Sequence, residues 1–274
     1  MEGRWQLLDV PQGQLEVEVS GRGEPVVVLQ TALDADELRP LGRHLATPGR
    51  HRVLQYHRRG YAGSSAPRGR PSLARDAADA AEVVRAMGVA PAHVVGVSYS
   101  AAVALRLAHT DPELVHSLSV VEPPPTGTPG GVDFRRACST LVEKFETAGA
   151  GVALDDFMTV LLGESWRDLG APDSVQRMER DAATFFAWDL PALRSWRFGA
   201  QEARAIRCPV LLVGGGRTAP WFSEMRRRLV RLLPHATEVL VDGADHTVAS
   251  THAPQLAGVL LRHLRDHPGA ALPD

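Results

Sequence analysis

The chain has 274 residues, of which 44 % are hydrophobic and 23 % charged, the values of an ordinary globular protein. This composition excludes a disordered chain, a collagen and a coiled coil, and the length suits one large domain with or without an insertion. The net charge of −2 gives no general basic field, so neither nucleic acid nor a membrane surface is expected as a partner.

Cysteine usage and the N-terminal residues indicate the compartment. Cys138 and Cys208 are far apart and neither belongs to a C-x-x-C pair, which argues against a disulfide scaffold and against a zinc site. Residues 1–13 have no basic stretch followed by an apolar run, and no apolar segment reaches the roughly 18 residues that span a bilayer. We therefore expect a cytoplasmic protein.

Strand and helix signals alternate along the first part of the chain. Residues 14–20 alternate apolar and polar side chains, as a half-buried edge strand does. Short apolar runs, typical of strands buried on both faces of a parallel sheet, follow at 25–29, 53–56, 93–97 and 117–121. Helical spacing of apolar residues predicts helices over 36–46, 73–87 and 99–109. This alternation indicates βαβ units.

The composition changes after residue 121. Residues 122–131 contain four prolines and three glycines, which excludes regular structure there. Nine of the twelve Phe and Trp (seven Phe and five Trp in all) lie in the stretch that follows, up to about residue 201, and strand signals are absent from it. The alternation then resumes, with strands expected at 209–213 and 238–241 and helices at 220–233 and 253–264. We predict an α/β core over 1–122 and 202–274, interrupted by a helical cap over 123–201.

Ser98 stands where a predicted strand becomes a helix, in the sequence His93-Val-Val-Gly-Val-Ser-Tyr-Ser-Ala-Ala. Small residues on both sides allow the strand and the helix to approach closely. Such a turn lifts the serine hydroxyl above the sheet edge, and the helix N-terminus supplies a backbone N–H and a positive dipole end. A nucleophile that passes through an oxyanion benefits from both. Ser98 could instead be only a helix cap, and Ser100 is the rival hydroxyl.

With this elbow the chain resembles the α/β-hydrolase superfamily over nearly its whole length. Two further segments carry the resemblance. Tyr56-His-Arg-Arg-Gly-Tyr-Ala-Gly-Ser-Ser65 is similar to the Asp-x-Arg-Gly-x-Gly-x-Ser segment after the fourth strand, and Asp242-Gly-Ala-Asp-His-Thr247 is similar to the Gly-x-x-His turn after the last strand. The resemblance implies a mostly parallel sheet flanked by helices, with a helical cap inserted after the sixth strand.

His246 is the candidate base, because the resemblance places its turn over the nucleophile. An imidazole that titrates near neutrality can take the serine proton and return it to the leaving group. His57 replaces the Asp of the similar family segment, and we interpret it as structural. The adjacent pair Arg58 and Arg59 could suggest an acidic substrate, but charges in such a loop are more often structural.

The acid departs from the usual pattern of the superfamily. Arg217 occupies the place after the seventh strand where an Asp is common, and the next carboxylate, Glu224, falls in a predicted helix. In some relatives the acid ends the sixth strand instead, and Glu122 fits that position. A glutamate there could orient the imidazole of His246. Asp245 and Asp242 are alternatives, and Glu122 could also be a structural residue paired with an arginine.

The remaining site residues are expected from the resemblance. Gln30 and Thr31 replace the common His-Gly after the third strand, so Ala32 is the expected oxyanion donor, together with the N–H of Tyr99. Four aromatic residues of the cap could line an apolar cleft above the nucleophile, although they could equally form the core of the cap: Phe185, Phe186, Trp188 and Trp196.

These observations predict a serine hydrolase that cleaves a carboxylic ester, thioester or lactone of an apolar small molecule through an acyl-enzyme. No metal or organic cofactor is implied. Three alternatives stay open: a non-hydrolytic ligand binder or biosynthetic cyclase, a carbon–carbon bond hydrolase, and a cofactor-free perhydrolase. The substrate itself and the oligomeric state do not follow from the sequence.

Overall fold

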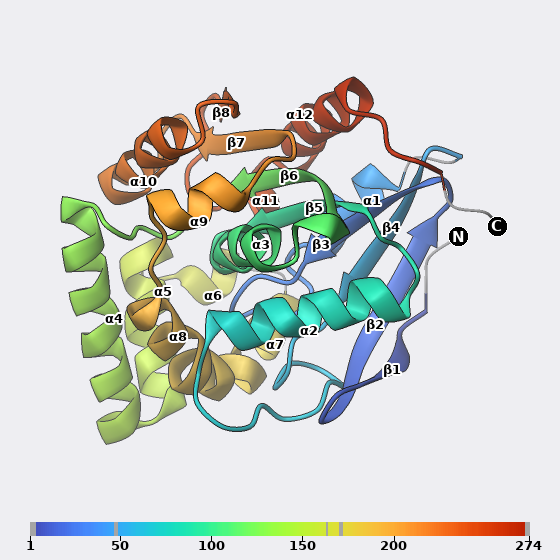
Figure 1. Cartoon of the computed structure of the whole chain (residues 1–274). Helices are drawn as coiled ribbons and strands as arrows, with labels where there is room; N and C mark the ends of the chain where they lie inside the picture. Colours follow the sequence, from blue (N-terminus) through green and yellow to red (C-terminus); the bar gives the residue numbers. More distant parts are fainter. Residues whose placement is uncertain (1–3, 47–48, 163, 170–171, 272–274) are drawn as a thin grey trace.

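The computed structural model describes residues 4–46, 49–162, 164–169 and 172–271. The rest of the expected core and cap, residues 1–3, 47–48, 163, 170–171 and 272–274, lies outside the described part. The described chain forms one eight-stranded sheet with helices on both faces (Figure 1). Its strands are β1 (Gln6–Val10), β2 (Gly13–Gly21), β3 (Glu24–Leu29), β4 (His51–Tyr56), β5 (Ala92–Val97), β6 (Val115–Val121), β7 (Val210–Gly215) and β8 (Thr237–Val241).

The sheet is mostly parallel, as predicted, in the order β1-β2-β4-β3-β5-β6-β7-β8. Only the pairings of β2 with β1 and with β4 are antiparallel. The expectation that residues 14–20 form an edge strand is wrong, because β1 pairs with the outer side of β2. The segment of β1 is largely exposed, with Leu7 at 55 % exposure, so it has no clear apolar alternation that would have predicted a strand.

Alternate residues of the central strands face two separate cores. On β3, Val27 and Leu29 pack under one layer of helices, whereas Val26 and Val28 pack under the other. The first layer contains α2 (Leu73–Ala86), α3 (Tyr99–Thr110), α9 (Ala200–Ala205) and α10 (Pro220–Leu232). The second contains α1 (Arg39–Leu45), α11 (Val248–Thr251) and α12 (Ala253–Asp266). Burial on both faces explains the continuous valine and leucine runs of these strands.

Between β6 and β7, a long helical segment precedes α9. It comprises α4 (Pro129–Ala148), α5 (Ala150–Leu162), α6 (Trp166–Leu169), α7 (Pro172–Thr184), the π-helical turn η2 (Phe185–Asp189) and α8 (Leu190–Ser195). We call these elements the helical insertion. They lie on the side toward which the arrowheads of β6 and β7 point (Figure 1), so they stand beside the loops that follow the strands. None of the described helices is both long enough and apolar enough to cross a membrane.

Candidate active site

Ser98 lies in a tight turn between β5 and α3. Its backbone angles, φ 50° and ψ −116°, are ones that a non-glycine residue adopts only under constraint. The constraint is close packing, since a Cβ on Gly96 would lie 2.3 Å from the carbonyl oxygen of Ser100. Ser100 itself is fully buried, and its hydroxyl donates to the carbonyl of Leu29 over 2.8 Å. Of the two serines, therefore, Ser98 is the one with its hydroxyl toward the site.

The imidazole of His246 connects Ser98 to Glu122. Its Nε2 lies 3.0 Å from the Oγ of Ser98, and its Nδ1 lies 3.2 Å from the Oε2 of Glu122. The three residues follow three different strands, β5, β6 and β8, whose carboxyl ends meet at one edge of the sheet. The structure thus brings together the three side chains that the sequence predicted as nucleophile, base and acid.

Glu122 is buried, and two donors beside His246 hold its carboxylate. The N–H of Gly215 donates to Oε1 over 2.8 Å, and the hydroxyl of Thr218 donates to Oε2 in a short hydrogen bond. Both residues belong to the end of β7 and the loop after it. Arg217, in the same loop, is exposed. The loop in which the superfamily commonly places its acid therefore supplies hydrogen-bond donors to an acid on the neighbouring strand.

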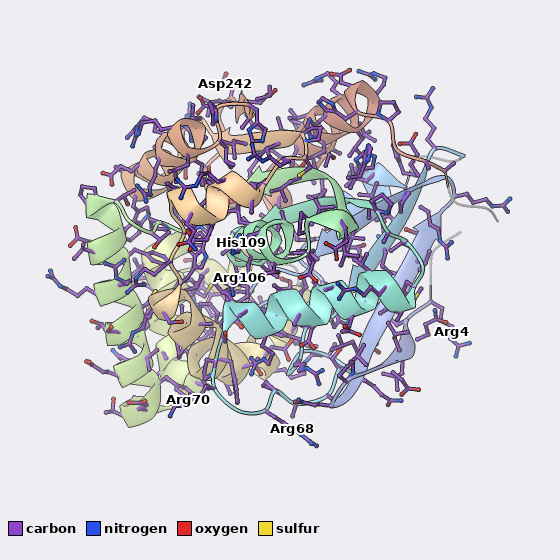
Figure 2. All side chains as sticks on the ribbon, in the orientation of Figure 1. Arg4, Arg68, Arg70, Arg106, His109 and Asp242 are labelled. Atoms are coloured by element: carbon purple, nitrogen blue, oxygen red, sulfur yellow. The ribbon has the colours of Figure 1, made fainter. Side chains whose placement is uncertain are left out.

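The other carboxylates considered from the sequence point elsewhere. Asp245 accepts from the N–H and the hydroxyl of Thr247 within its own turn. Asp242 is exposed and lies at the outer surface near β8 (Figure 2). Glu224 accepts from the N–H of Gly130 at the start of α4. Among these described groups, Glu122 alone has a hydrogen bond to His246.

His57 has a different environment from His246. Its ring is buried between the carboxylates of Glu16 and Asp36, at 2.9 Å and 3.1 Å, and stacks on Trp5. His57 thus replaces the Asp of the similar family segment and is hydrogen-bonded to two carboxylates. This agrees with the interpretation of His57 as a structural residue.

Phe222 is a site residue that the sequence did not reveal. Its ring stacks on the imidazole of His246, with centroids 3.9 Å apart and an angle of 17° between the planes. Phe222 lies in the first turn of α10 and also contacts the ring of Phe134 on α4. Its position after Pro220, just beyond the loop that follows β7, was the only available signal. The contact limits how the imidazole can turn.

The segment after β3 approaches the nucleophile turn. The hydroxyl of Thr31 donates to the carbonyl of Val97 over 2.9 Å, which ties the segment to the end of β5. Leu33 has a positive φ of 72°, so the chain turns sharply there. Within the described residues, no protein acceptor takes the backbone N–H of Ala32 or of Tyr99. Both N–H groups expected to bind the oxyanion thus lack an acceptor in the described protein.

A second carboxyl group, that of Glu37, interacts electrostatically with His246. Burial raises the pKa of Glu37 to about 6, although the hydroxyl of Ser250 donates to it over 2.9 Å and the neighbouring His246 favours its charged form. Glu37 follows the segment after β3, and Ser250 lies on α11.

The sequence matches the family model described as the alpha/beta hydrolase fold over residues 24–253, most of the chain. The chain belongs to this family.

Individual relatives of this α/β-hydrolase are distant. A curated protein of Azorhizobium caulinodans, named "Putative carbamate hydrolase RutD", is 27 % identical over 252 residues, which are 86 % of this chain and 89 % of the relative. Among solved structures, the bromoperoxidase from Bacillus anthracis has a TM-score of 0.79 at 19 % identity, covering 96 % of this chain and all of the other. A thermophilic esterase from Thermogutta terrifontis has a TM-score of 0.76 at 18 % identity, with coverages of 97 % and 99 %. The family and the curated relative indicate a hydrolase, and the two solved structures share its fold.

The four aromatic residues expected to line a pocket make their ring contacts with other aromatic residues or with Arg75. The rings of Phe185 and Phe186 contact Phe157 and Phe145 of the insertion. Trp196 is buried against Phe198, and the ring of Trp188 lies under the guanidinium of Arg75 from the helix layer of the core. In the described part of the chain, no ring contact joins these four residues to the imidazole of His246, whereas Phe222 has one.

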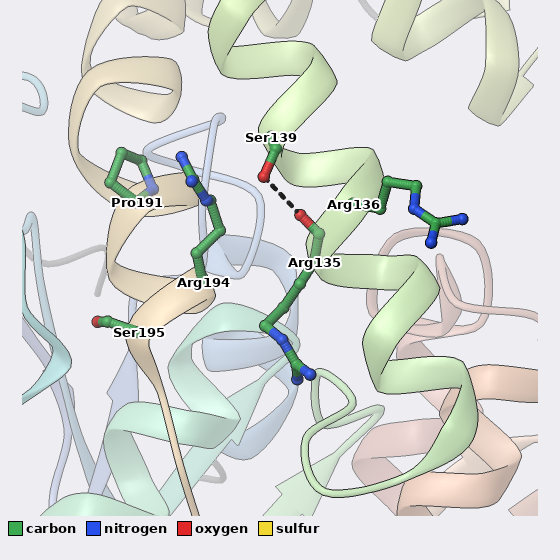
Figure 3. Close-up of a pocket in the computed structure, with 6 residues that line it drawn as sticks. All are labelled: Arg135, Arg136, Ser139, Pro191, Arg194 and Ser195. Carbon is green, nitrogen blue, oxygen red and sulfur yellow. Dashed lines mark hydrogen bonds between the residues drawn. The ribbon is translucent and has the colours of Figure 1, made fainter.

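A surface cleft of about 480 Å³ lies on the insertion, between α4 and α8, and its lining does not include Ser98, His246 or Glu122. Its lining residues are Arg135, Arg136, Ser139, Pro191, Arg194 and Ser195 (Figure 3). The three guanidinium groups point in different directions, so they do not converge on one anion. No group of three or more His, Cys, Asp or Glu side chains in the described residues is arranged to hold a metal ion.

Proposed function

We propose that this α/β-hydrolase is a serine hydrolase that cleaves a carboxylic ester, thioester or lactone of an apolar small molecule. One observation carries the proposal: a chain of hydrogen bonds runs from the Oγ of Ser98 through both nitrogens of His246 to the buried carboxylate of Glu122. A binding protein would need neither this alignment nor the strained backbone at Ser98.

In the first half of the reaction, the Oγ of Ser98 attacks the carbonyl carbon of the substrate while its proton passes to the Nε2 of His246. The carbonyl double bond opens to an oxyanion. When this intermediate collapses, the bond to the alcohol or thiol breaks, and His246 returns the proton to the leaving group. In the second half, His246 takes a proton from water, the hydroxide attacks the acyl carbon, and the acid leaves as Ser98 regains its proton.

Glu122 acts on His246 rather than on the substrate. By accepting from Nδ1–H it selects the tautomer in which Nε2 is free to receive the serine proton, and its charge stabilises the imidazolium that forms. The N–H of Gly215 and the hydroxyl of Thr218 keep this carboxylate in place. Phe222 holds the ring plane from the side.

The oxyanion is bound by the N–H groups of Ala32 and Tyr99 in this proposal. Donors that are already oriented stabilise the developing charge without further rearrangement, which is often the largest contribution to such catalysis. Phe222 beside the imidazole, with Phe134 of the insertion against it, supports an apolar acyl or alcohol group in the substrate.

The proposal is tested by intact mass before and after treatment with a fluorophosphonate, followed by peptide mapping of the adduct. We expect one adduct on Ser98, absent from His246→Ala and retained in His252→Ala, a matched change six residues further along the chain. Labelled protein should hydrolyse no p-nitrophenyl esters. A folded wild-type protein that gives no adduct and no ester hydrolysis would contradict the proposal and favour a ligand-binding or cyclase role.

A further inference from the structure

Arg58 is a buried cation whose hydrogen-bond donors are all engaged. Its side chain is 4 % exposed. The Nε donates to the carbonyl of Gln30, one Nη donates to Asp76 and Asp189, and the other donates to Asp189 and to the carbonyl of Thr31, at 2.6–3.2 Å. An arginine has five N–H donors, and here each has an acceptor. Arg58 is thus unavailable to an acidic substrate, and its role is internal.

The acceptors of Arg58 come from parts of the chain that are far apart in sequence. Gln30 and Thr31 belong to the segment after β3 that holds one expected oxyanion donor. Asp76, on α2, also accepts from the hydroxyl of Tyr99 at the start of α3. Asp189 ends the π-helical turn η2 of the insertion. One guanidinium therefore joins the oxyanion segment, the nucleophile helix and the insertion.

Tyr61 joins the same groups on a second path. Its hydroxyl donates to Asp189 over 2.6 Å and accepts from the N–H of Leu33 over 3.1 Å. The aromatic faces of Tyr61 and Tyr99 lie 4.9 Å and 4.2 Å from the guanidinium carbon of Arg58, close enough for cation–π attraction. The segment 30–33 is thus held on both sides of Ala32, by Arg58 before it and by Tyr61 after it.

Peptide geometry links these contacts to catalysis. The carbonyl of Thr31 and the N–H of Ala32 belong to one planar, trans peptide unit, so they point in opposite directions. When Arg58 fixes the direction of the Thr31 oxygen, it also fixes the direction of the Ala32 N–H. Asp189 in turn holds two of the guanidinium N–H groups and the hydroxyl of Tyr61.

We propose that Arg58 is a positioning residue that aims the N–H of Ala32 at the oxyanion, and that Asp189 makes this alignment depend on the docked helical insertion. The proposal rests on the proposed serine hydrolase function. The contact is one between residues 131 positions apart, so an insertion displaced at η2 would take two hydrogen bonds from Arg58 and the acceptor of the Tyr61 hydroxyl together.

The experiment compares Arg58→Lys, Asp189→Asn and Tyr61→Phe with Arg59→Lys as the matched control. Arg59 is also buried, pairs with Asp79 over 2.8 Å and donates to two backbone carbonyls, but those belong to Pro11 and Gln12, away from the site. The readouts are kcat and KM for an ester, the inhibition constant of a trifluoromethyl ketone, and amide exchange over residues 30–36. The ketone is a suitable probe because attack by the Oγ of Ser98 on its carbonyl carbon gives an oxyanion.

We expect Arg58→Lys and Asp189→Asn to lower kcat by about 10- to 100-fold, part of the loss on removing a whole oxyanion donor, with KM changed less than threefold. The affinity for the ketone should fall by the same factor as kcat/KM. Tyr61→Phe, the variant least able to disturb folding, should lower kcat about tenfold and speed amide exchange in 30–36. Arg59→Lys should lower the melting temperature with kcat within twofold of wild type.

Two outcomes overturn the proposal. In one, the three variants lose no more kcat than Arg59→Lys. In the other, they lose kcat while the affinity for the ketone is unchanged. A wild-type protein without ester hydrolysis or fluorophosphonate labelling would instead remove the serine hydrolase function, and amide exchange over 30–36 would then decide alone whether Arg58 and Asp189 order this segment.

Discussion

At the scale of single residues, the proposed mechanism assigns Glu122 the charge that stabilises an imidazolium at His246. Glu122→Gln keeps the shape of the side chain but removes this charge and leaves the tautomer of His246 undefined. We expect kcat for an ester to fall on the order of 10²- to 10⁴-fold, with a small change in KM, because the loss is confined to the transition state. Steady-state kinetics on the folded variant measures this.

The matched control for Glu122→Gln is Asp245→Asn, the same neutralisation beside His246. Asp245 binds only to Thr247 in the described structure, so kcat should stay within about twofold of wild type. Equal losses in the two variants would mean that charge near the imidazole matters and that the hydrogen bond from Nδ1 does not.

Thr218 gives a second test at the residue scale. Thr218→Val removes the hydroxyl that donates to the Oε2 of Glu122, the same oxygen that accepts from His246. A hydrogen bond to a charged group contributes about 1.5–3 kcal/mol, so kcat/KM should fall roughly 10- to 100-fold. Thr247→Val, a threonine that binds Asp245 instead, serves as the control. Similar rates for Thr218→Val and wild type would show that Gly215 alone holds the carboxylate.

The residues that the sequence predicted and those that it missed differ in a physical way. Ser98 stood out because its turn needs small neighbours in adjacent positions, and Glu122 because it ends the predicted sixth strand, where the resemblance to the superfamily implies an acid in some relatives. Thr218 and Phe222 act through contacts with residues far along the chain, and neither type of side chain is distinctive by itself. Asp189 reaches Arg58 only because the insertion docks on the sheet, which no local pattern reveals.

At the scale of elements, the junction of β5 and α3 depends on the missing side chain of Gly96. A methyl group in Gly96→Ala would lie 2.3 Å from the carbonyl oxygen of Ser100 and 2.8 Å from the Cα of Ala101, so strand and helix would have to separate. Both contacts are with backbone atoms, which cannot move aside as the end of a flexible side chain can. We expect a loss of about 1–3 kcal/mol in the free energy of unfolding, as for an overpacked core, and a loss of activity because Ser98 shifts.

Gly258→Ala is the matched control for Gly96→Ala. Gly258 lies inside α12, and a methyl group there meets no atom closer than 4.0 Å. Alanine is the better helix former by roughly 0.5–1 kcal/mol, so urea denaturation should show a gain in stability. A Gly96→Ala protein as stable and active as wild type would show that the elbow tolerates a wider approach of strand and helix.

The boundaries of most elements follow from such local rules. The helix expected over 73–87 forms as α2, and the side chain of Ser72 just before it accepts from the N–H of Ala74. The helix expected over 36–46 is shorter, beginning at Arg39, because residues 34–37 fold into turns in which Asp34 accepts from the N–H of Asp36. No local rule predicted β1, because an exposed strand that pairs on one side only needs no apolar pattern.

At the scale of the whole molecule, buried histidines make the stability depend on pH. His93, at the start of β5, and His263, in α12, are buried at the end of the sheet opposite to the candidate site. Burial lowers the pKa of each to about 4, from the usual value near 6.5, and for His93 the carboxylate of Glu24 opposes the shift. Both side chains are therefore neutral in the folded protein at pH 5.

The sign of the pH effect follows from proton binding. Above pH 6.5 neither state binds the extra protons; between pH 6.5 and 4 the unfolded chain binds them and the folded protein does not, so stability falls as the pH falls. Each group then contributes a loss of up to about 3 kcal/mol by pH 4. Urea denaturation at pH 7.5, 6 and 5 should show a steadily lower midpoint. His263→Gln should flatten this slope, whereas the exposed His235→Gln should leave it unchanged. A midpoint that is constant from pH 7.5 to 5 would mean that these imidazoles are protonated inside the folded protein.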